Sequence, residues 1–267
     1  MSALVPFGVR VACHRAARHV HWWLRPLRWA TERVDPADAG GVVAERTSPL
    51  RRAIPSPGPL YTDEKIHNLR LAAARVQGLR IAPGEVFSFC RTVGKTTRAR
   101  GYVPALELRG EKLITSLGGA LCQLSNLLFL VALDVNAEIV ERHRHGFDLF
   151  RDTDRTVPFG CGATVFYNYV DLQFRNTLAS AITLDVRVEE HALRAAARSQ
   201  AALPFSVRVH ETDHRYFRDG PHVYRSNRVW REVSRAGGTE PTVELLFENT
   251  CRVLYPADDL VDRSEAR

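Results

Sequence analysis

The segment from Ser116 to Phe129 constrains the fold of this chain more than any other stretch of it. It follows Leu113-Ile114-Thr115, the end of an alternating run that is typical of a strand. Gly118-Gly119 then permits a tight turn or a positive φ angle. From Cys122 onward, apolar residues recur at helical spacing, at Leu124, Leu127, Leu128 and Val131. The pattern therefore predicts a strand, a turn and a helix in direct succession, with Cys122 in the first turn of the helix.

The predicted position of Cys122 matters chemically. A helix N-terminus carries unpaired N–H groups and a partial positive charge, which favour the reactive thiolate over the thiol. The N–H groups of Gly119, Ala120 or Leu121 can also stabilise a developing oxyanion. A nucleophile that opens a helix after a glycine turn is a known way to present a reactive side chain. The alternative is an unreactive cysteine, because free cysteine is among the most buried residue types.

The rest of the chain predicts an α+β fold, in which a mostly antiparallel β core is joined by two main helices. One helix is expected from Thr62, its capping residue, to about Gln77, with Gly78 as its stop. The other, from Cys122 to about Leu133, is nearly all apolar and is therefore expected to be buried. Period-2 patterns predict strands or hairpins over residues 102–108, 112–115, 136–145, 163–167, 170–174, 182–188, 205–209, 216–223, 229–230 and 243–247. Residues 189–202 are expected to form a short helix or an exposed connection.

Composition shifts divide the chain into four parts. Residues 1–34 form a basic helical arm, and residues 35–60 are rich in Pro, Gly and Ser and are expected to be a linker. The main domain is expected over residues 61–256, with a core over 61–177 and a β-rich extension over 178–256. Residues 257–267 are expected to form a frayed tail.

The N-terminal arm combines Arg and His with apolar residues and several tryptophans, among them Trp22, Trp23 and Trp29. Two interpretations stay open for it. A basic, Trp-bearing amphipathic helix is suited to peripheral contact with a membrane surface. The same helix is equally able to pack its aromatic side against the domain.

Charge and cysteine content narrow the class of protein. The 267 residues carry a net charge of +7, which either steers an acidic partner or reflects solubility alone. No nucleic-acid-binding motif is found, so nucleic acid is not an expected partner. The five cysteines are odd in number and scattered, which indicates a reducing compartment or free thiols and not a disulfide framework. With no signal-peptide pattern and no apolar membrane span, we expect a cytoplasmic location. Peripheral contact at the inner face of the membrane stays open, as one of the two interpretations of the arm.

His143 and His145 are two residues apart, so a strand would place them on one face. One interpretation makes a histidine the general base for Cys122. The other is a zinc site formed with Cys122 and Cys161, but no CxxC or HExxH motif supports it. We therefore expect no metal and no other cofactor.

Several short motifs, in order and at matching spacing, resemble the VanW family. These motifs are Pro83–Phe89, Gly101-Tyr102, Gly118–Phe129, Glu141-Arg142-x-x-His145, Ala163-Thr164-Val165 and Asp171-Leu172-x-x-x-Asn176. They cover about residues 61–177. The family has three glycines where this chain has Gly118-Gly119-Ala120, and it has Asp where this chain has Gly162.

The resemblance implies a cell-envelope function, since the family is named after an accessory protein of a vancomycin-resistance cluster. Larger members have been linked to L,D-transpeptidase-type cross-linking through the cysteine that matches Cys122. The residues themselves support thiol acyl transfer, in which Cys122 attacks a carbonyl of a peptidoglycan precursor or a similar peptide and His145, which the family motif singles out, acts as base and then acid. Asp171 either orients His145 or caps a turn. The predicted oxyanion or substrate-binding residues are Gly118, Gly119, Gln123, Ser125, Asn126 and Arg142.

A second class of function stays open beside this one. The protein is then a non-catalytic accessory or binding protein for cell-wall precursors, and Cys122 is a packing residue. The two departures from the family pattern, Ala120 and Gly162, favour this alternative, because one restricts the backbone and the other removes a carboxylate.

Overall fold

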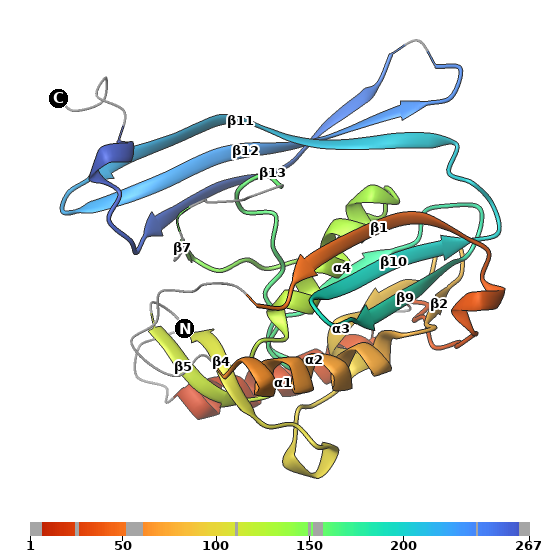
Figure 1. The fold of residues 1–267 in the computed structure, drawn as a ribbon, viewed down its shortest axis with the longest axis horizontal. Coiled ribbons are helices and arrows are strands. Elements are labelled where there is room, and N and C mark those ends of the chain that lie inside the picture. The colour runs from red at the N-terminus through yellow and green to blue at the C-terminus, as the bar shows by residue number, and fades with distance from the viewer. Residues whose placement is uncertain are drawn as a thin grey trace.

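The computed structural model describes residues 7–24, 27–51, 61–109, 112–148, 151, 157–238 and 240–261. Strands in mainly antiparallel sheets outnumber the helices, so the predicted α+β class is confirmed. Figure 1 shows a long C-terminal sheet at the top of the molecule and the helices α1 (Phe7–Leu24) and α2 (Thr62–Val76) at the bottom. The described residues also contain three short 3-10 helices, at Pro36–Asp38, Arg98–Arg100 and Asp258–Leu260.

A four-stranded sheet lies at the centre of the hydrophobic core. Its strands, in spatial order, are β1 (Gly41–Pro49), β10 (Ala192–Ser199), β9 (Ile182–Val188) and β2 (Arg80–Ile81). Helix α2 contacts β9, and helix α4 (Cys122–Asp134) contacts β1 and β10. Ala195, Ala196 and Ala197 of β10 are fully buried. Because these side chains are small, neighbouring elements can pack closely on the sheet.

Two sequence expectations about this sheet are wrong. Residues 189–202 contain β10, which pairs with β1 on one side and β9 on the other. Alanine has the highest intrinsic helix propensity, but pairing with a neighbouring strand on each edge outweighs that preference. The linker expected over residues 35–60 contains β1, whose glycine and proline lie at the ends of the strand, where they are tolerated. Residues 52–60 of that segment lie outside the described residues.

Two smaller sheets surround the start of α4. The hairpin of β4 (Pro104–Arg109) and β5 (Lys112–Leu117) is confirmed as predicted. A second sheet has the order β3 (Val86–Ser88), β8 (Gln173–Arg175) and β6 (Glu138–Glu141), and β3 runs directly into the short helix α3 (Phe89–Val93). The strand expected over residues 163–167 is absent, since these described residues form a loop with one isolated bridge, between Phe166 and Val170.

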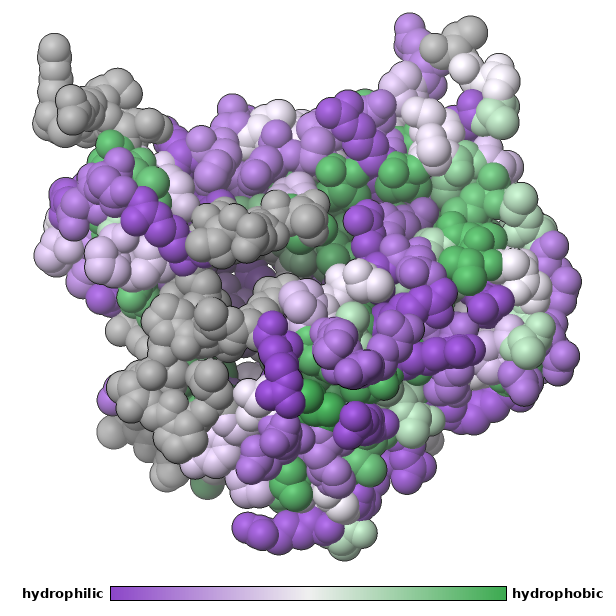
Figure 2. Space-filling model, in the orientation of Figure 1, coloured by the Kyte–Doolittle hydropathy of each residue, from purple (hydrophilic) through white to green (hydrophobic). Residues whose placement is uncertain are grey.

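The C-terminal sheet has the order β11 (Phe205–Asp219), β12 (His222–Arg235), β13 (Thr242–Val253) and β7 (Phe147–Asp148). The predicted hairpin around Asp219-Gly220 is confirmed, since Asp219 pairs with His222. The strands are longer than the sequence predicted, because polar side chains on their exposed positions interrupt the apolar alternation. Figure 2 shows the surface of the molecule in the orientation of Figure 1. This face is mostly hydrophilic, and hydrophobic side chains gather toward its upper right.

Helix α2 differs from the prediction at its N-terminal end and agrees with it at its C-terminal end. Tyr61, with φ of 47°, is the N-cap and makes no side-chain capping bond, so Thr62 is the first helical residue and the prediction that Thr62 caps the helix is wrong. Gly78, with φ of 74°, follows the C-cap Gln77 and confirms the predicted stop. Within the described part of the chain, none of the helices is both long and apolar enough to cross a membrane.

Candidate functional site

Gly118 and Gly119 form the predicted turn that places Cys122 at the start of α4. Gly118 has φ of 74°, a region that favours glycine. Gly119 packs so closely on β4 that an added Cβ would lie 2.2 Å from the carbonyl oxygen of Ala105. The turn is therefore fixed both by backbone conformation and by the lack of side chains.

Ala120 stands where the resembled family pattern has a third glycine, and its backbone adopts a conformation that favours glycine. Its φ angle is 74°, in the left-handed region. An L-residue with a side chain is less stable there than in the right-handed region by about 1–2 kcal/mol. The substitution thus adds strain to the turn, while the turn keeps its glycine-type geometry.

Cys122 is half-buried and lines a cavity of about 260 Å³, which is near the lower limit for a ligand pocket. Its Sγ lies 3.9 Å from the carbonyl oxygen of Val165. The apolar part of the cavity wall includes Phe89, Val93, Leu117, Leu121, Phe166 and Tyr167. Its charged side chains are Arg15, Lys95 and Glu107. The cavity therefore combines a thiol, an apolar wall and charges of both signs.

Some of the backbone N–H groups beside Cys122 already donate hydrogen bonds within the protein, and others have no recorded acceptor among the described residues. The N–H of Gly118 donates to the Val103 carbonyl at 3.0 Å, and that of Gly119 donates to the Ser116 carbonyl at 3.1 Å. Among the described residues, no backbone acceptor is recorded for the N–H groups of residues 120–122. The donors that remain for an oxyanion are therefore those of residues 120–122, which end the glycine turn and begin α4.

The thiol of Cys122 is not ionised at neutral pH. Burial raises its pKa to about 11, and the negative charge of Glu107 acts in the same direction. The effect of the helix N-terminus, which the sequence suggested would favour the thiolate, is therefore outweighed in the unliganded protein. Any nucleophilic attack by Cys122 then requires a base to remove its proton as the attack occurs.

His143 and His145 do not share a strand face, because β6 ends at Glu141 and the chain leaves the sheet there. His143 is exposed and forms a contact of 3.0 Å with Glu141. His145 is half-buried, and burial lowers its pKa below the ordinary 6.5 although Glu107 opposes the shift. At neutral pH His145 is therefore a neutral imidazole that can accept a proton.

Glu107 connects the two residues that the sequence paired as nucleophile and base. Its charge raises the pKa of Cys122 and acts on that of His145 in the same direction, so both groups lie within its electrostatic range. Its carboxylate also accepts a hydrogen bond from Ser116 Oγ. No direct hydrogen bond between Cys122 and His145 is recorded among the described residues.

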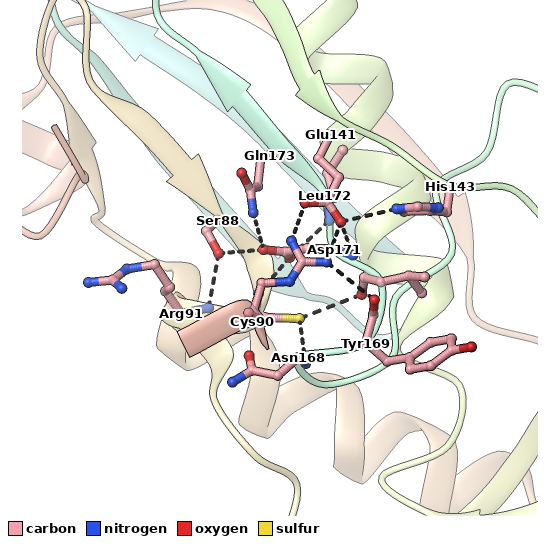
Figure 3. A network of polar contacts seen from close by, with 12 residues as sticks. Ser88, Cys90, Arg91, Glu141, His143, Asn168, Tyr169, Asp171, Leu172 and Gln173 are labelled. Carbon is pink, nitrogen blue, oxygen red and sulfur yellow. Dashed lines mark hydrogen bonds and ion pairs between the residues drawn. The ribbon is translucent and has the colours of Figure 1, made fainter. Parts of the chain in front are cut away.

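Asp171 lies in a separate buried network, which Figure 3 shows at close range. Its carboxylate accepts hydrogen bonds from Ser88 Oγ at 2.6 Å, from the Cys90 N–H at 2.8 Å and from Gln173 Nε2 at 3.0 Å. It also accepts from the N–H of Leu172, and burial raises its pKa despite these donors. Both carboxylate oxygens are thus occupied, and none of these bonds goes to His145.

Glu141 links this network to helix α1. Burial raises its pKa, but hydrogen bonds from His143 and Arg18 outweigh the effect and lower the value to about 2. Arg18 Nη2 lies 2.7 Å from Glu141 Oε1, and the N–H of Asp171 donates to the same oxygen at 3.0 Å. Glu141 is therefore a permanent anion that fixes α1 to the domain.

Three of the predicted binding residues hold loops around the start of α4. Gln123 Nε2 donates to Ser48 Oγ and to the Pro49 carbonyl, each at 2.9 Å. Ser125 Oγ donates to the Ala163 carbonyl at 2.6 Å, and Asn126 Oδ1 accepts from the Ala163 N–H at 2.6 Å. Ser125 and Asn126 thus fix both polar backbone groups of Ala163, in the loop that leads to Val165 and the cavity.

Arg142 has a similar supporting position. Its Nε donates to the Gly162 carbonyl at 2.8 Å, and its guanidinium lies over the rings of Phe129 and Phe247, with the latter centroid at 3.9 Å. Burial lowers its pKa to about 10. Gly162, where the family has Asp, lies beside Asn126, whose Oδ1 would be 3.1 Å from an added Cβ. None of Gln123, Ser125, Asn126 and Arg142 is among the residues that line the cavity.

The cysteines and histidines form no metal cluster in the part of the chain that the structure describes. All five cysteines are free, as the odd and scattered pattern predicted. A further cavity of about 240 Å³ lies beside the Arg46–Asp134 ion pair and Val207–Val209, and no predicted site residue lines it.

The sequence did not identify Arg15 or Glu107 as site residues. Arg15 comes from α1, far from the cysteine in sequence, and its Nε donates to the Tyr167 carbonyl at 3.1 Å. Its guanidinium lies over the rings of Phe166 and Tyr167. For Glu107 the sequence showed only a carboxylate in a predicted strand. Its role is visible only once the β4–β5 hairpin is placed beside the start of α4.

The charge of Glu107 predicts how fast Cys122 reacts with an alkylating reagent. Removing this charge in Glu107→Gln is expected to lower the pKa of the thiol, and to increase iodoacetamide labelling of Cys122 at pH 8 about two- to fivefold. Peptide mass spectrometry measures the rate at each cysteine, with the exposed Cys13 as the internal control. Slower labelling of Cys122 in the variant would contradict this, since it would indicate that Glu107 deprotonates the thiol.

Comparison with known proteins matches the part of the chain that contains the Cys122 cavity. The family model described as VanW like protein matches residues 64–197. The Vancomycin B-type resistance protein VanW of Enterococcus faecalis is 30% identical over 208 residues, which cover 78% of this chain and 76% of that protein. The uncharacterised protein YoaR of Bacillus subtilis is 34% identical over 113 residues, which cover 41% of this chain and 35% of that protein. No solved structure matches the chain.

Proposed function

Because the chain belongs to the VanW family, we propose that it binds a peptide-like cell-envelope precursor in the Cys122 cavity and transfers an acyl group through this cysteine. The position of Cys122 carries the proposal. It opens a rigid buried helix, lines a cavity of about 260 Å³ and lies beside backbone N–H groups with no recorded acceptor among the described residues. A thiol, a ligand-sized space and oxyanion donors are the parts that acyl transfer needs.

In the proposed reaction, Cys122 Sγ attacks a peptide carbonyl while His145 removes the thiol proton. The N–H groups at the start of α4 stabilise the oxyanion. The C–N bond then breaks, and the leaving amine takes the proton from His145. An acceptor amine, or water, attacks the thioester, returns the acyl group to a C–N or C–O bond and releases the thiol. Because the Cys122–His145 contact is not formed in the free protein, ligand binding must bring the two together.

The charges in the cavity indicate the class of ligand. Arg15 is held by one bond from its Nε, and no acceptor is recorded among the described residues for its two terminal amino groups. Lys95 is exposed at the same cavity, whereas Glu107 supplies the single described carboxylate of its lining. Two cations against one anion suit a peptide that ends in a free carboxylate, with an amino group toward Glu107.

A binding protein without catalysis is the second candidate. The raised pKa of Cys122 and the occupied carboxylate of Asp171 favour it, because neither a thiolate nor a Cys-His-Asp arrangement is preformed. In this case the same cavity holds the peptide and Cys122 contributes only packing. We propose a cytoplasmic location for either function, supported by the five free cysteines.

Binding and turnover distinguish the candidates. The ligand is a peptidoglycan stem peptide with a free terminal carboxylate, and calorimetry measures its affinity while chromatography measures release of its terminal residue. Arg15→Ala is expected to weaken binding about tenfold, and Arg28→Ala, at an exposed position outside the cavity, should leave it unchanged. Cys122→Ala should retain binding and lose release. Release should also fall as pH drops below 6.5, where His145 begins to hold a proton.

Binding without release in the wild-type protein would exclude acyl transfer and establish the second candidate. Absence of binding would exclude both.

A further inference from the structure

Helix α1 presents its apolar side to solvent and its cations to the protein. Its outward positions recur at helical spacing, at Val9, Ala12, Cys13, Ala16, Ala17, Val20, Trp23 and Leu24, and all are exposed. Val9, Val20, Trp23 and Leu24 are 50%, 52%, 84% and 65% exposed. This arrangement is the reverse of an ordinary surface helix, whose apolar face is buried.

The inward side of α1 explains the inversion. Val11 is buried, Arg18 pairs with Glu141, and Arg15 contacts the loop at Tyr167. The cations face inward because the domain beneath them offers the half-buried carboxylate of Glu141 and the backbone carbonyl of Tyr167, which apolar side chains would not pair. The apolar residues therefore have no partner within the described part of the chain, and the exposed stripe is a fixed feature of the docked helix.

The surroundings of the stripe are basic. The helix contains no Asp or Glu. Arg91 is exposed and stacks over Trp22 and Trp29 at 4.8 and 4.7 Å, next to the C-terminal end of the helix. Arg28 follows shortly in the chain. Its side chain is 71% exposed and lies 3.9 Å from the carboxylate of Glu85. An apolar stripe with an exposed tryptophan and neighbouring arginines is complementary to an anionic lipid surface, where the rings enter the headgroup region and the cations meet phosphate.

We propose that the outward face of α1, which we call the α1 stripe and define as the eight outward residues given above, binds the surface of an anionic lipid bilayer. The helix lies in the plane of the interface and does not cross the membrane. It lies outside residues 64–197, so this surface is separate from the segment that the family model matches. Its inward Arg15 lines the Cys122 cavity, which places that cavity directly behind the membrane-facing helix.

Vesicle co-sedimentation of the full-length protein tests the proposal. The probes are vesicles of phosphatidylcholine alone and of phosphatidylcholine mixed with phosphatidylglycerol. We expect binding to the mixed vesicles, together with a blue shift of tryptophan fluorescence that is lost in Trp23→Phe. Val20→Glu combined with Trp23→Glu should reduce the partition coefficient at least about tenfold.

Val243→Glu is the matched control, because Val243 is 51% exposed on β13 and Val20 is 52% exposed on α1. It should bind vesicles as the wild type does, and thermal unfolding should show that all variants are folded. Equal loss of binding in Val243→Glu and in the double variant with Val20→Glu and Trp23→Glu would overturn the proposal. Equal binding to neutral and anionic vesicles, or no binding at all, would also overturn it. A dimer in light scattering that Val20→Glu dissociates, without vesicle binding, would assign the stripe to a second copy of the chain.

Discussion

Replacing Gly119 with alanine is expected to reduce the free energy of unfolding by about 3 kcal/mol or more. The added Cβ would lie 2.2 Å from the carbonyl oxygen of Ala105 and 2.6 Å from its carbonyl carbon. These are backbone atoms of a paired strand, so no side-chain rotation relieves the overlap. Either β4 or the turn must move, and both define the position of Cys122.

Gly146→Ala is the matched control for this substitution. Gly146 does not have a positive φ, and an added Cβ there would meet nothing within 4 Å. Urea unfolding of both variants measures the difference in free energy. A Gly119→Ala protein as stable as the Gly146→Ala protein would contradict the close approach of the turn to β4.

Replacing Asn68 with alanine is the second change with a large expected effect, a loss of about 3 kcal/mol. Asn68 is fully buried on α2. Its Nδ2 donates to the Val103 carbonyl at 2.9 Å and to the Gly119 carbonyl at 3.3 Å, and its Oδ1 accepts from the Val103 N–H at 3.0 Å. One side chain therefore joins α2 to the strand entry and to the glycine turn. Its removal leaves the Val103 N–H and the Gly119 carbonyl without these partners, while the Val103 carbonyl keeps its bond from the Gly118 N–H.

Arg70→Ala provides the control, because Arg70 is exposed on the same helix. It should change stability by less than about 0.5 kcal/mol. Asn68→Asp adds a sharper test. We expect burial to raise the pKa of the new carboxyl, whose protonated form can donate to a carbonyl at low pH, so the variant should lose stability as pH rises through that pKa. A pH-independent loss would contradict the assigned hydrogen bonds.

Local pattern was sufficient to predict the centre of the molecule. The hairpin over β4 and β5, the turn at Gly118 and the helix opened by Cys122 all follow from short-range rules, since each is defined by neighbours in sequence. Asn68 and Asn126, which lie on helices, both bond to the backbone of neighbouring loops. A polar side chain on an apolar helix has few other ways to be satisfied.

The features that the sequence did not predict depend on contacts between segments that lie far apart in the chain. Ala192–Ser199 is a strand only because β1 and β9 lie on both sides of it. His143 and His145 diverge because β6 ends at Glu141, which bonds to Arg18 from a helix more than a hundred residues earlier in the chain. Asp171 was paired with His145 by analogy, whereas the fold places Ser88 and Cys90 around it. These outcomes depend on which distant segments meet, and local propensity carries no information about that.

Detection of an acyl group on Cys122 is the measurement that tests the central claim most directly. The wild-type protein is mixed with a peptidoglycan stem peptide, quenched in acid, and analysed by intact and peptide mass spectrometry. We predict a mass increase equal to the acyl fragment on the peptide that contains Cys122, absent in Cys122→Ala and more abundant when the acceptor amine is omitted. Release of the terminal residue with no adduct on Cys122, or release that persists in Cys122→Ala, would contradict the account.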